Sequence, residues 1–132
     1  MFETHTEESA GHVERLVQVF EIIGKPARTK TCEAMTGLTA EMEEHLEDFG
    51  KTEAADDVLI GCAQAMEHCE ISLDGLLETW AAKLGLTDAE ILFSATLDEE
   101  KKADQLLTEA AGTPPAAMAK APPAPNTRTK AA

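Results

Sequence analysis

Large apolar residues recur every three to four positions along most of this chain, in four segments that glycine and proline separate. This spacing is typical of α-helices that bury one face. It predicts long helices near residues 2–23, 52–84 and 88–111, with a weaker helix near 31–49. Strand signals are scarce, because the sequence has no tyrosine and little alternation of apolar and polar residues. The chain is therefore expected to be all-α.

The ends of the predicted helices coincide with residues that stop or start helices. Gly24, Gly50 and Gly85 follow the first three segments, and glycine commonly ends a helix. Thr87 and Glu90 have the three-residue spacing of a capping box, which would open the last helix. The short connections predict an antiparallel bundle of three long helices plus a short connecting helix.

The strongest apolar stripe runs through the segment 52–84, with Leu73 at its middle. We expect Leu73 to be buried, so that Leu73→Ala would cost ~2–5 kcal/mol of stability. The stripe repeats at intervals of three, four and seven residues and comprises Leu59, Cys62, Met66, Cys69, Leu73, Leu77, Trp80 and Leu84.

The end of the chain differs in composition from the rest. Residues 113–132 hold five of the six prolines and three basic residues, with no acid among them. Such a segment buries too little apolar surface to offset the entropy lost on ordering. The sequence therefore predicts one folded domain, residues 1–112, followed by a disordered tail, residues 113–132.

The chain is acidic, with a formal net charge of −14. This charge repels phosphate backbones, which argues against a nucleic-acid partner, and it suits cations. A solvated acidic surface would explain the charge equally well. Three cysteines without a signal peptide indicate reduced thiols and a cytoplasmic protein. No apolar run approaches the ~18 residues that suggest a membrane span, so no membrane partner is expected.

Acidic and histidine side chains interrupt the apolar faces of three predicted helices. Successive helical residues turn by about 100°, which puts His5 and His12 inside the first stripe with Glu8 at its edge. The inward or flanking positions that could ligate a metal are Glu8, His12, Glu67, Glu70, Glu100 and Asp104. Taken singly, each acid is more simply explained as part of a solvated surface. Their coincidence on three helices favours a metal site of the carboxylate and imidazole kind, which suits iron, manganese or zinc.

Four segments also carry a resemblance to a known family: FETHTEESAGHVERLVQVFEIIG, KTCEAMTGL, AQAMEHCEI and ATLDEEKKADQLLTEAA. Across residues 2–111 the chain closely resembles the ferritin-like YciE/YciF family of bacterial stress-associated proteins. The resemblance implies a ferritin-like bundle with a dinuclear site, of the di-iron or di-manganese type, at the six positions just named. It implies no particular reaction, so whether the chain is an enzyme stays open.

The chain departs from this family at its start. Family members usually begin with a further bundle helix that supplies another carboxylate, whereas here Met1 stands directly before the second-helix motif. Three long helices would then leave an apolar groove, which predicts a homo-oligomer, most simply a dimer. The alternative is a metal-free helical module that binds another protein through that groove. Cys69 also stands where the third-helix motif usually has an aromatic residue.

Overall fold

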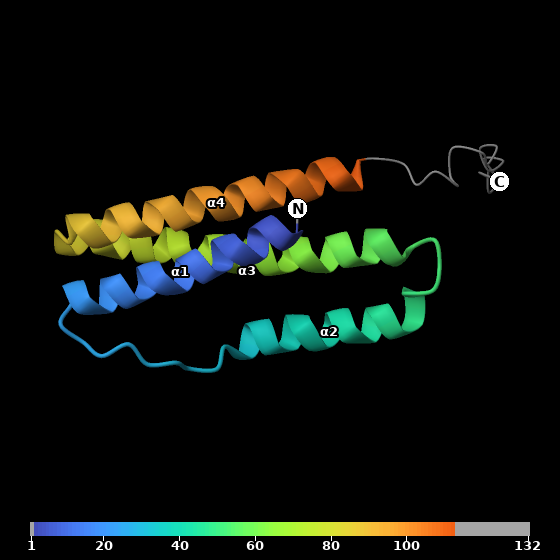
Figure 1. The fold of residues 1–132 in the computed structure, drawn as a ribbon, viewed down its shortest axis with the longest axis horizontal. Coiled ribbons are helices and arrows are strands. Elements are labelled where there is room, and N and C mark those ends of the chain that lie inside the picture. The colour runs from blue at the N-terminus through green and yellow to red at the C-terminus, as the bar shows by residue number, and fades with distance from the viewer. Residues whose placement is uncertain (1, 113–132) are drawn as a thin grey trace, which may run out of the picture.

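The computed structural model describes residues 2–112, with side chains from Thr4 onward, and these residues form helices and connections without a strand. The four helices are α1 (Phe2–Ile22), α2 (Glu33–Phe49), α3 (Ala55–Leu84) and α4 (Thr87–Ala111) (Figure 1). The all-α class and all four predicted helices are confirmed, with ends that move by at most three residues. The tail predicted for residues 113–132 lies outside the described residues.

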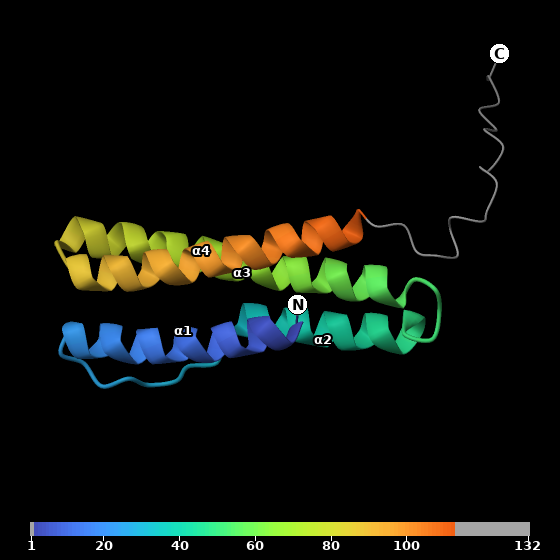
Figure 2. The same cartoon turned by 45° about the horizontal axis from the view of Figure 1, so that its top comes forward.

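The α4 helix organises the bundle. It packs against both α1 and α3, while α2 packs against α3 alone. Figures 1 and 2 show α1 and α2 on the same side of the α3–α4 pair. The α1 helix runs beside the end where α3 turns into α4, and α2 runs beside the opposite end. The first half of α3 is therefore covered by α2, and the second half is not.

All three glycines that the sequence predicts as helix stops follow the ends of helices; Gly24 and Gly85 have left-handed backbone, whereas Gly50 has right-handed backbone. Gly24 has a φ of 65° and Gly85 a φ of 70°, a conformation that costs glycine little. After Gly85 the chain makes the closing bond of such a turn, with the Leu86 N–H donating to the Ala81 carbonyl at 2.9 Å.

The predicted capping box at Thr87 is wrong. The helix already includes Thr87, so Leu86 occupies the N-cap position and no side chain caps the helix. The physical reason is the tight turn, because Leu86 is held by its bond to Ala81 and its side chain packs against the core. The turn between α3 and α4 is thus fixed by apolar packing rather than by a polar cap.

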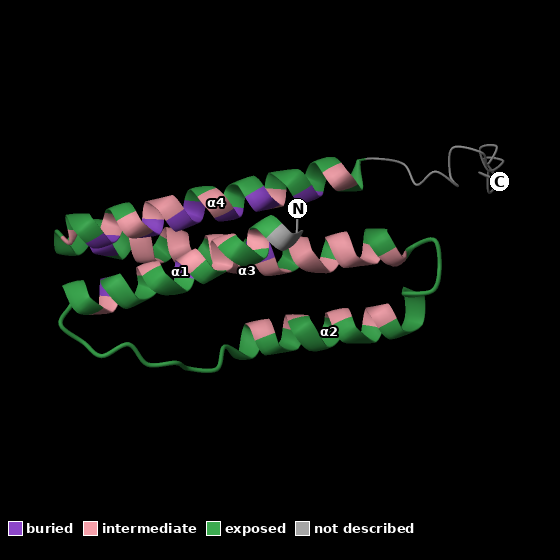
Figure 3. Cartoon of the chain, viewed as in Figure 1, coloured by how far each residue is buried: buried purple, intermediate pink, exposed green. Residues whose placement is uncertain are grey.

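The apolar core is small and lies mostly along α4 (Figure 3). Val19, Ala81, Ala89 and Phe93 form a buried cluster near the α3–α4 turn, with Leu77, Leu86 and Leu92 packed against it. Farther along α4, the buried apolar side chains are Leu97, Ala103 and Leu107. Between these positions α4 also buries Thr96 and Glu100, so polar groups share the interior.

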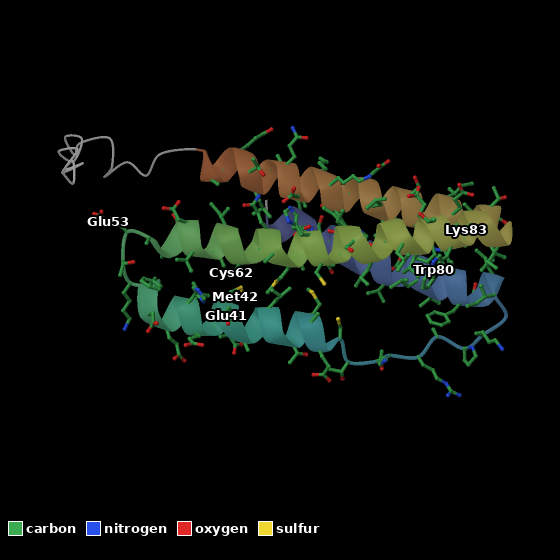
Figure 4. The ribbon with its side chains drawn as sticks, turned by 180° about the vertical axis from the view of Figure 1, so that it is seen from behind. Glu41, Met42, Glu53, Cys62, Trp80 and Lys83 are labelled. Atoms are coloured by element: carbon green, nitrogen blue, oxygen red, sulfur yellow. The ribbon has the colours of Figure 1, made fainter. Side chains whose placement is uncertain are left out.

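The expectation that Leu73 is buried is wrong, since it is 48% exposed. The α3 helix turns a different face, which includes Glu67 and Ala81, into the interior. The first half of its long apolar stripe is covered where α2 passes, near Cys62 and Met42 (Figure 4). Beyond α2, Leu77 packs against the core, but Leu73, Trp80 and Leu84 of the same stripe are exposed. The large loss expected for Leu73→Ala is therefore withdrawn.

None of the four helices, within the residues that the structure describes, is long and apolar enough to cross a bilayer. All three cysteines are free: Cys32 is exposed, and Cys62 and Cys69 are half-buried. Neither observation bears on the compartment, so the cytoplasmic location stays a prediction.

Core packing on α4 gives a direct test of the fold. Leu97 is 6% exposed and one of its methyl groups lies 3.9 Å from the position of a Cβ on Gly75. We expect Leu97→Ala to lower the free energy of unfolding by ~2–5 kcal/mol, because it leaves a cavity between α3 and α4. The control is Ile91→Ala, which removes as many carbons from a side chain that is 61% exposed. Equal losses in urea titrations of the two variants would contradict this packing.

Candidate metal centre

Three helices bring four potential metal ligands together in the interior. His5 comes from α1, Glu67 and Glu70 from α3, and Glu100 from α4. One ligand atom from each lies within 4.8 Å of all the others. Glu67 is 4% exposed and Glu100 is 1% exposed. His5 and Glu70 are half-buried, so the cluster is partly shielded from solvent. It is built from parts of the chain that are distant in sequence.

Helix geometry explains why these side chains meet. Residues three or four apart share a helical face, and Glu67 and Glu70 have that spacing on α3. On α1 the Nδ1 of His5 lies 4.0 Å from a carboxylate oxygen of Glu8, three residues on. Because α1 and α3 both pack on α4, their polar positions converge on Glu100.

Three buried polar atoms in the cluster lack a hydrogen-bond partner among the described residues: His5 Nδ1, Glu67 Oε2 and Glu100 Oε2. The other nitrogen of the His5 ring lies 3.2 Å from Glu67 Oε1. An unpartnered buried oxygen costs about 1–3 kcal/mol, and more when it is charged. The orphaned atoms, and a donor set of three carboxylates and one imidazole, fit a divalent cation.

Glu67 and Glu100 are close neighbours in this cluster, and two ionised carboxylates repel each other in the interior. Burial, aided by the neighbouring Glu67 and Glu70, raises the pKa of Glu100 to about 8. Burial also raises the pKa of Glu67, although Glu100 opposes that shift. Without a metal ion at neutral pH, Glu100 is therefore mainly protonated.

His12 connects the cluster to a second network at the edge of α4. Its Nδ1 lies 2.9 Å from Glu100 and its Nε2 lies 2.8 Å from Glu99. Arg15 donates two hydrogen bonds to the Glu99 carboxylate, at 2.6 and 2.7 Å, and a third to Thr96 at 3.1 Å. The bonds from Arg15 and His12 lower the pKa of Glu99 to about 2. Glu99 thus stays ionised and fixes the His12 ring.

A cavity of about 130 Å³ opens beside the cluster, between α1, α3 and α4. Its acidic and imidazole lining comes from His12, Glu70, Asp74 and Glu100. Burial raises the pKa of Asp74, with a further rise from Glu70 and an opposing effect from His12. The cavity is large enough for several water molecules, and two of the four cluster ligands, Glu70 and Glu100, face it.

The structure brings three of the six predicted ligands together, namely Glu67, Glu70 and Glu100. His12 contacts Glu100 but stands on the cavity side, and Glu8 flanks His5. Their roles as ligands stay predictions.

Asp104 is held apart from the four clustered side chains. One of its oxygens lies 3.1 Å from His68 and 3.3 Å from Gln64, and both of these residues belong to α3. Its charge still helps to raise the pKa of Glu67. Asp104 is therefore a neighbour of the cluster in this arrangement, and its predicted role as a ligand is untested.

Sequence reasoning missed three residues of the site. His5 was recognised as inward but left out of the ligand set. Asp74 follows Glu70 by four residues on α3, a spacing that puts two side chains on one helical face, so the pattern could have found it. Arg15 gave no such signal, because its role depends on Glu99 of a distant helix.

Comparisons with known proteins agree on one family. A family model described as a domain of unknown function, DUF892, matches residues 1–119. Protein YciF of Escherichia coli strain K12 is 44% identical over 112 residues, which cover 83% of this chain and 67% of that protein.

Two solved structures are also similar. The crystal structure of the E. coli stress protein YciF matches with a TM-score of 0.78 and 41% identity, covering 83% of this chain and 70% of that one. YcfI from Rhodopseudomonas palustris, for which a structural role has been put forward, matches with a TM-score of 0.77 and 35% identity, covering 80% and 68%. The chain thus spans about two thirds of each relative. It belongs to the DUF892 family and is a relative of YciF, which confirms the YciE/YciF resemblance predicted from its sequence.

Proposed function

We propose that this protein binds divalent iron or manganese through His5, Glu67, Glu70 and Glu100. The observation that carries the proposal is the pair Glu67 and Glu100, almost fully buried, with one oxygen of each lacking a hydrogen-bond partner. Buried carboxylates are costly unless they are paired, protonated or bound to a cation. A fold selected for stability alone would have an apolar pair at these two positions.

The donor types support a transition metal over calcium. Carboxylate oxygens with an imidazole suit iron, manganese and zinc, whereas calcium takes oxygen ligands only. Binding would displace the proton that Glu100 holds, since a ligating carboxylate must be ionised. Three carboxylates around one dication leave a net negative site, which favours a second positive charge nearby.

The cavity beside the cluster suggests where a second ion would be held. Glu70 and Glu100 belong to the four-residue cluster and also line the cavity, whereas His12 and Asp74 line the cavity but are not in the cluster. Glu70 and Glu100 would then be shared, with His12 held in place by Glu99 and Arg15. A two-ion centre of this kind supplies Lewis-acid and redox chemistry towards oxygen or peroxide.

A role in the stress response is proposed from the family alone. The similar E. coli protein YciF is described as a stress protein, and a cytoplasmic metal centre that reacts with oxygen species would suit such a role. Comparing survival of a deletion strain and its complement under peroxide would test it. Equal survival of the two strains would count against it.

A second candidate function is a metal-free interaction or structural module. It is favoured by the large apolar side chains that α1 and α3 leave exposed. The structural role put forward for the relative YcfI is consistent with it. Metal binding separates the two candidates, because an interaction module has no need of the buried carboxylates.

Manganese(II) offers the cleanest test of the metal site, because it does not oxidise readily in air. We expect one or two ions to bind the metal-free protein, and an ion present at 100 times its dissociation constant to add about 2.7 kcal/mol of stability. Glu70→Gln should weaken binding by about tenfold or more, since it removes a charged ligand. Calorimetric titration and thermal melts measure both effects.

The control is Glu43→Gln, which removes the same charge from the exposed side of α2. It should bind manganese as the unmodified chain does. If Glu70→Gln and Glu43→Gln bind equally well, the cation is held by general surface acidity and the proposed site is wrong.

In the metal-free protein, the buried Glu100 carboxyl group should make stability depend on pH. The pKa of Glu100 is about 8 in the folded protein against a reference value of 4.5, so the folded state binds more protons between these values. Its stability therefore falls as pH rises from about 5 to 8. Glu100→Gln removes this loss, and we expect its melting temperature at pH 8 to exceed that of the unmodified protein by about 5 °C or more.

The same variant should no longer be stabilised by manganese. At pH 5 the two melting temperatures should converge, because Glu100 is then protonated in the folded protein. If Glu100→Gln melts no higher than the unmodified protein at pH 8, the ionised Glu100 carboxylate does not destabilise the folded protein, and this account of the site is wrong.

A further inference from the structure

A second cavity, of about 270 Å³, lies beside the metal-ligand cluster, between α1 and α4. It shares no lining residue with the 130 Å³ cavity, which also extends to α3. We call it the α1–α4 pocket. It has room for several water molecules, so an ion can enter it with part of its hydration shell. The described residues that line it are Thr4, His5 and Glu8 of α1 and Lys102, Ala103 and Leu106 of α4.

His5 is the residue that the α1–α4 pocket shares with the cluster. Its Nε2 faces Glu67 at 3.2 Å, and its Nδ1 lies 4.0 Å from a carboxylate oxygen of Glu8. The Nδ1 has no hydrogen-bond partner among the described residues. Because a metal–ligand bond is about 2.0–2.2 Å long, one ion can bridge two atoms that are 4.0 Å apart. The His5 ring thus connects an acid of the pocket to an acid of the buried cluster.

The acids on the two sides of His5 differ in their exposure to solvent. The Glu8 side chain is 24% exposed, whereas that of Glu67 is 5% exposed. None of the three carboxylates of the cluster lines the α1–α4 pocket. An ion that arrives through this pocket therefore meets Glu8 first, His5 second and the buried carboxylates last.

Each of the two cavities beside the cluster has one lysine or arginine in its lining, Arg15 in the smaller cavity and Lys102 in the α1–α4 pocket. Arg15 donates two hydrogen bonds to Glu99, so its positive charge is fixed in place. Lys102 is exposed, and its charge is carried at the end of a flexible stem. Both charges repel a dication, but Lys102 can move aside into solvent. The α1–α4 pocket is therefore the easier approach, and Lys102 limits its rate.

We propose that divalent ions enter and leave the metal centre through the α1–α4 pocket, by way of Glu8 and then His5, and that Lys102 slows both directions. This proposal rests on the proposed function, since it names the path by which that metal site is filled. Because the same positive charge also slows release, Lys102 helps to retain an ion that has reached the cluster.

The rates at which the full-length chain binds and releases manganese(II) test this route. We expect Lys102→Gln to raise both rates about fivefold and to change the dissociation constant by less than about twofold, because it removes one charge near the path of a dication. The matched control is Lys101→Gln, which removes the same charge from an exposed neighbour outside the pocket. Stopped-flow mixing with a fluorescent manganese chelator measures the rates, in ~0.15 M salt where distant charges are screened.

Glu8→Gln should have the opposite effect and slow both rates about fivefold, because the first carboxylate on the path loses its charge. Its matched control is Glu7→Gln, at an exposed neighbour that does not line the pocket. Leu106→Trp should also slow both rates, because it narrows the pocket without a change of charge. Ile91→Trp is the control for that variant, since Ile91 is 61% exposed on α4 and lies outside the pocket. Circular dichroism confirms that each variant is folded.

Three results would overturn the proposal. If manganese binds but each variant has the same rates as its control, the metal site stands and the ion takes another path. If Glu8→Gln releases manganese faster and binds it more weakly, Glu8 is a ligand of the bound ion and does not act in its passage. If the unmodified chain binds no manganese at equilibrium, the proposed function fails, and the route fails with it.

Discussion

The rest of this structure depends on two glutamates that face each other inside a small acidic bundle. Glu67 and Glu100 are buried against one another, and both cannot be ionised there without a positive charge between them. A proton on Glu100 satisfies the pair in part. A dication would satisfy it more fully and would also bring in His5 and Glu70. The interior is thus organised around charge compensation as much as around apolar packing.

The need to compensate this buried charge also explains the arrangement of the residues around the pair. Glu99 is kept ionised by Arg15 and holds His12, so an imidazole always stands next to Glu100. Asp74 lies at the far side of the cavity, where its charge is disfavoured by burial. A cation in the cavity would favour the ionised forms of Asp74 and Glu100, whose charges burial disfavours.

The same constraint limits the apolar core. Polar side chains occupy the middle of α1, α3 and α4, so tight packing is concentrated near the α3–α4 turn around Phe93. Elsewhere α1 and α3 are left with apolar surface that no described part of the chain covers. A polar interior and an exposed apolar face therefore occur together, because polar side chains of α1, α3 and α4 occupy interior space that apolar side chains would otherwise fill.

The sequence allowed the helices to be placed but not the faces that they bury. Periodicity marks every helix, and glycine marks their ends, because both depend on neighbouring residues alone. The burial of Glu67 and the exposure of Leu73 depend on which helix lies opposite each face of α3. The apolar stripe of α3 does not predict which face that is. Glu70 and Glu100 could be found because charge on an inward position is rare. Arg15 could not, since nothing local distinguishes it from a surface arginine.

The most direct test of a metal centre is a crystal of the full chain grown with manganese(II), measured for anomalous scattering from manganese. The account predicts a strong peak bonded to carboxylate oxygens of Glu67, Glu70 and Glu100 and to a ring nitrogen of His5. Manganese bound only at exposed acids, with no peak between Glu67, Glu70 and Glu100, would contradict it.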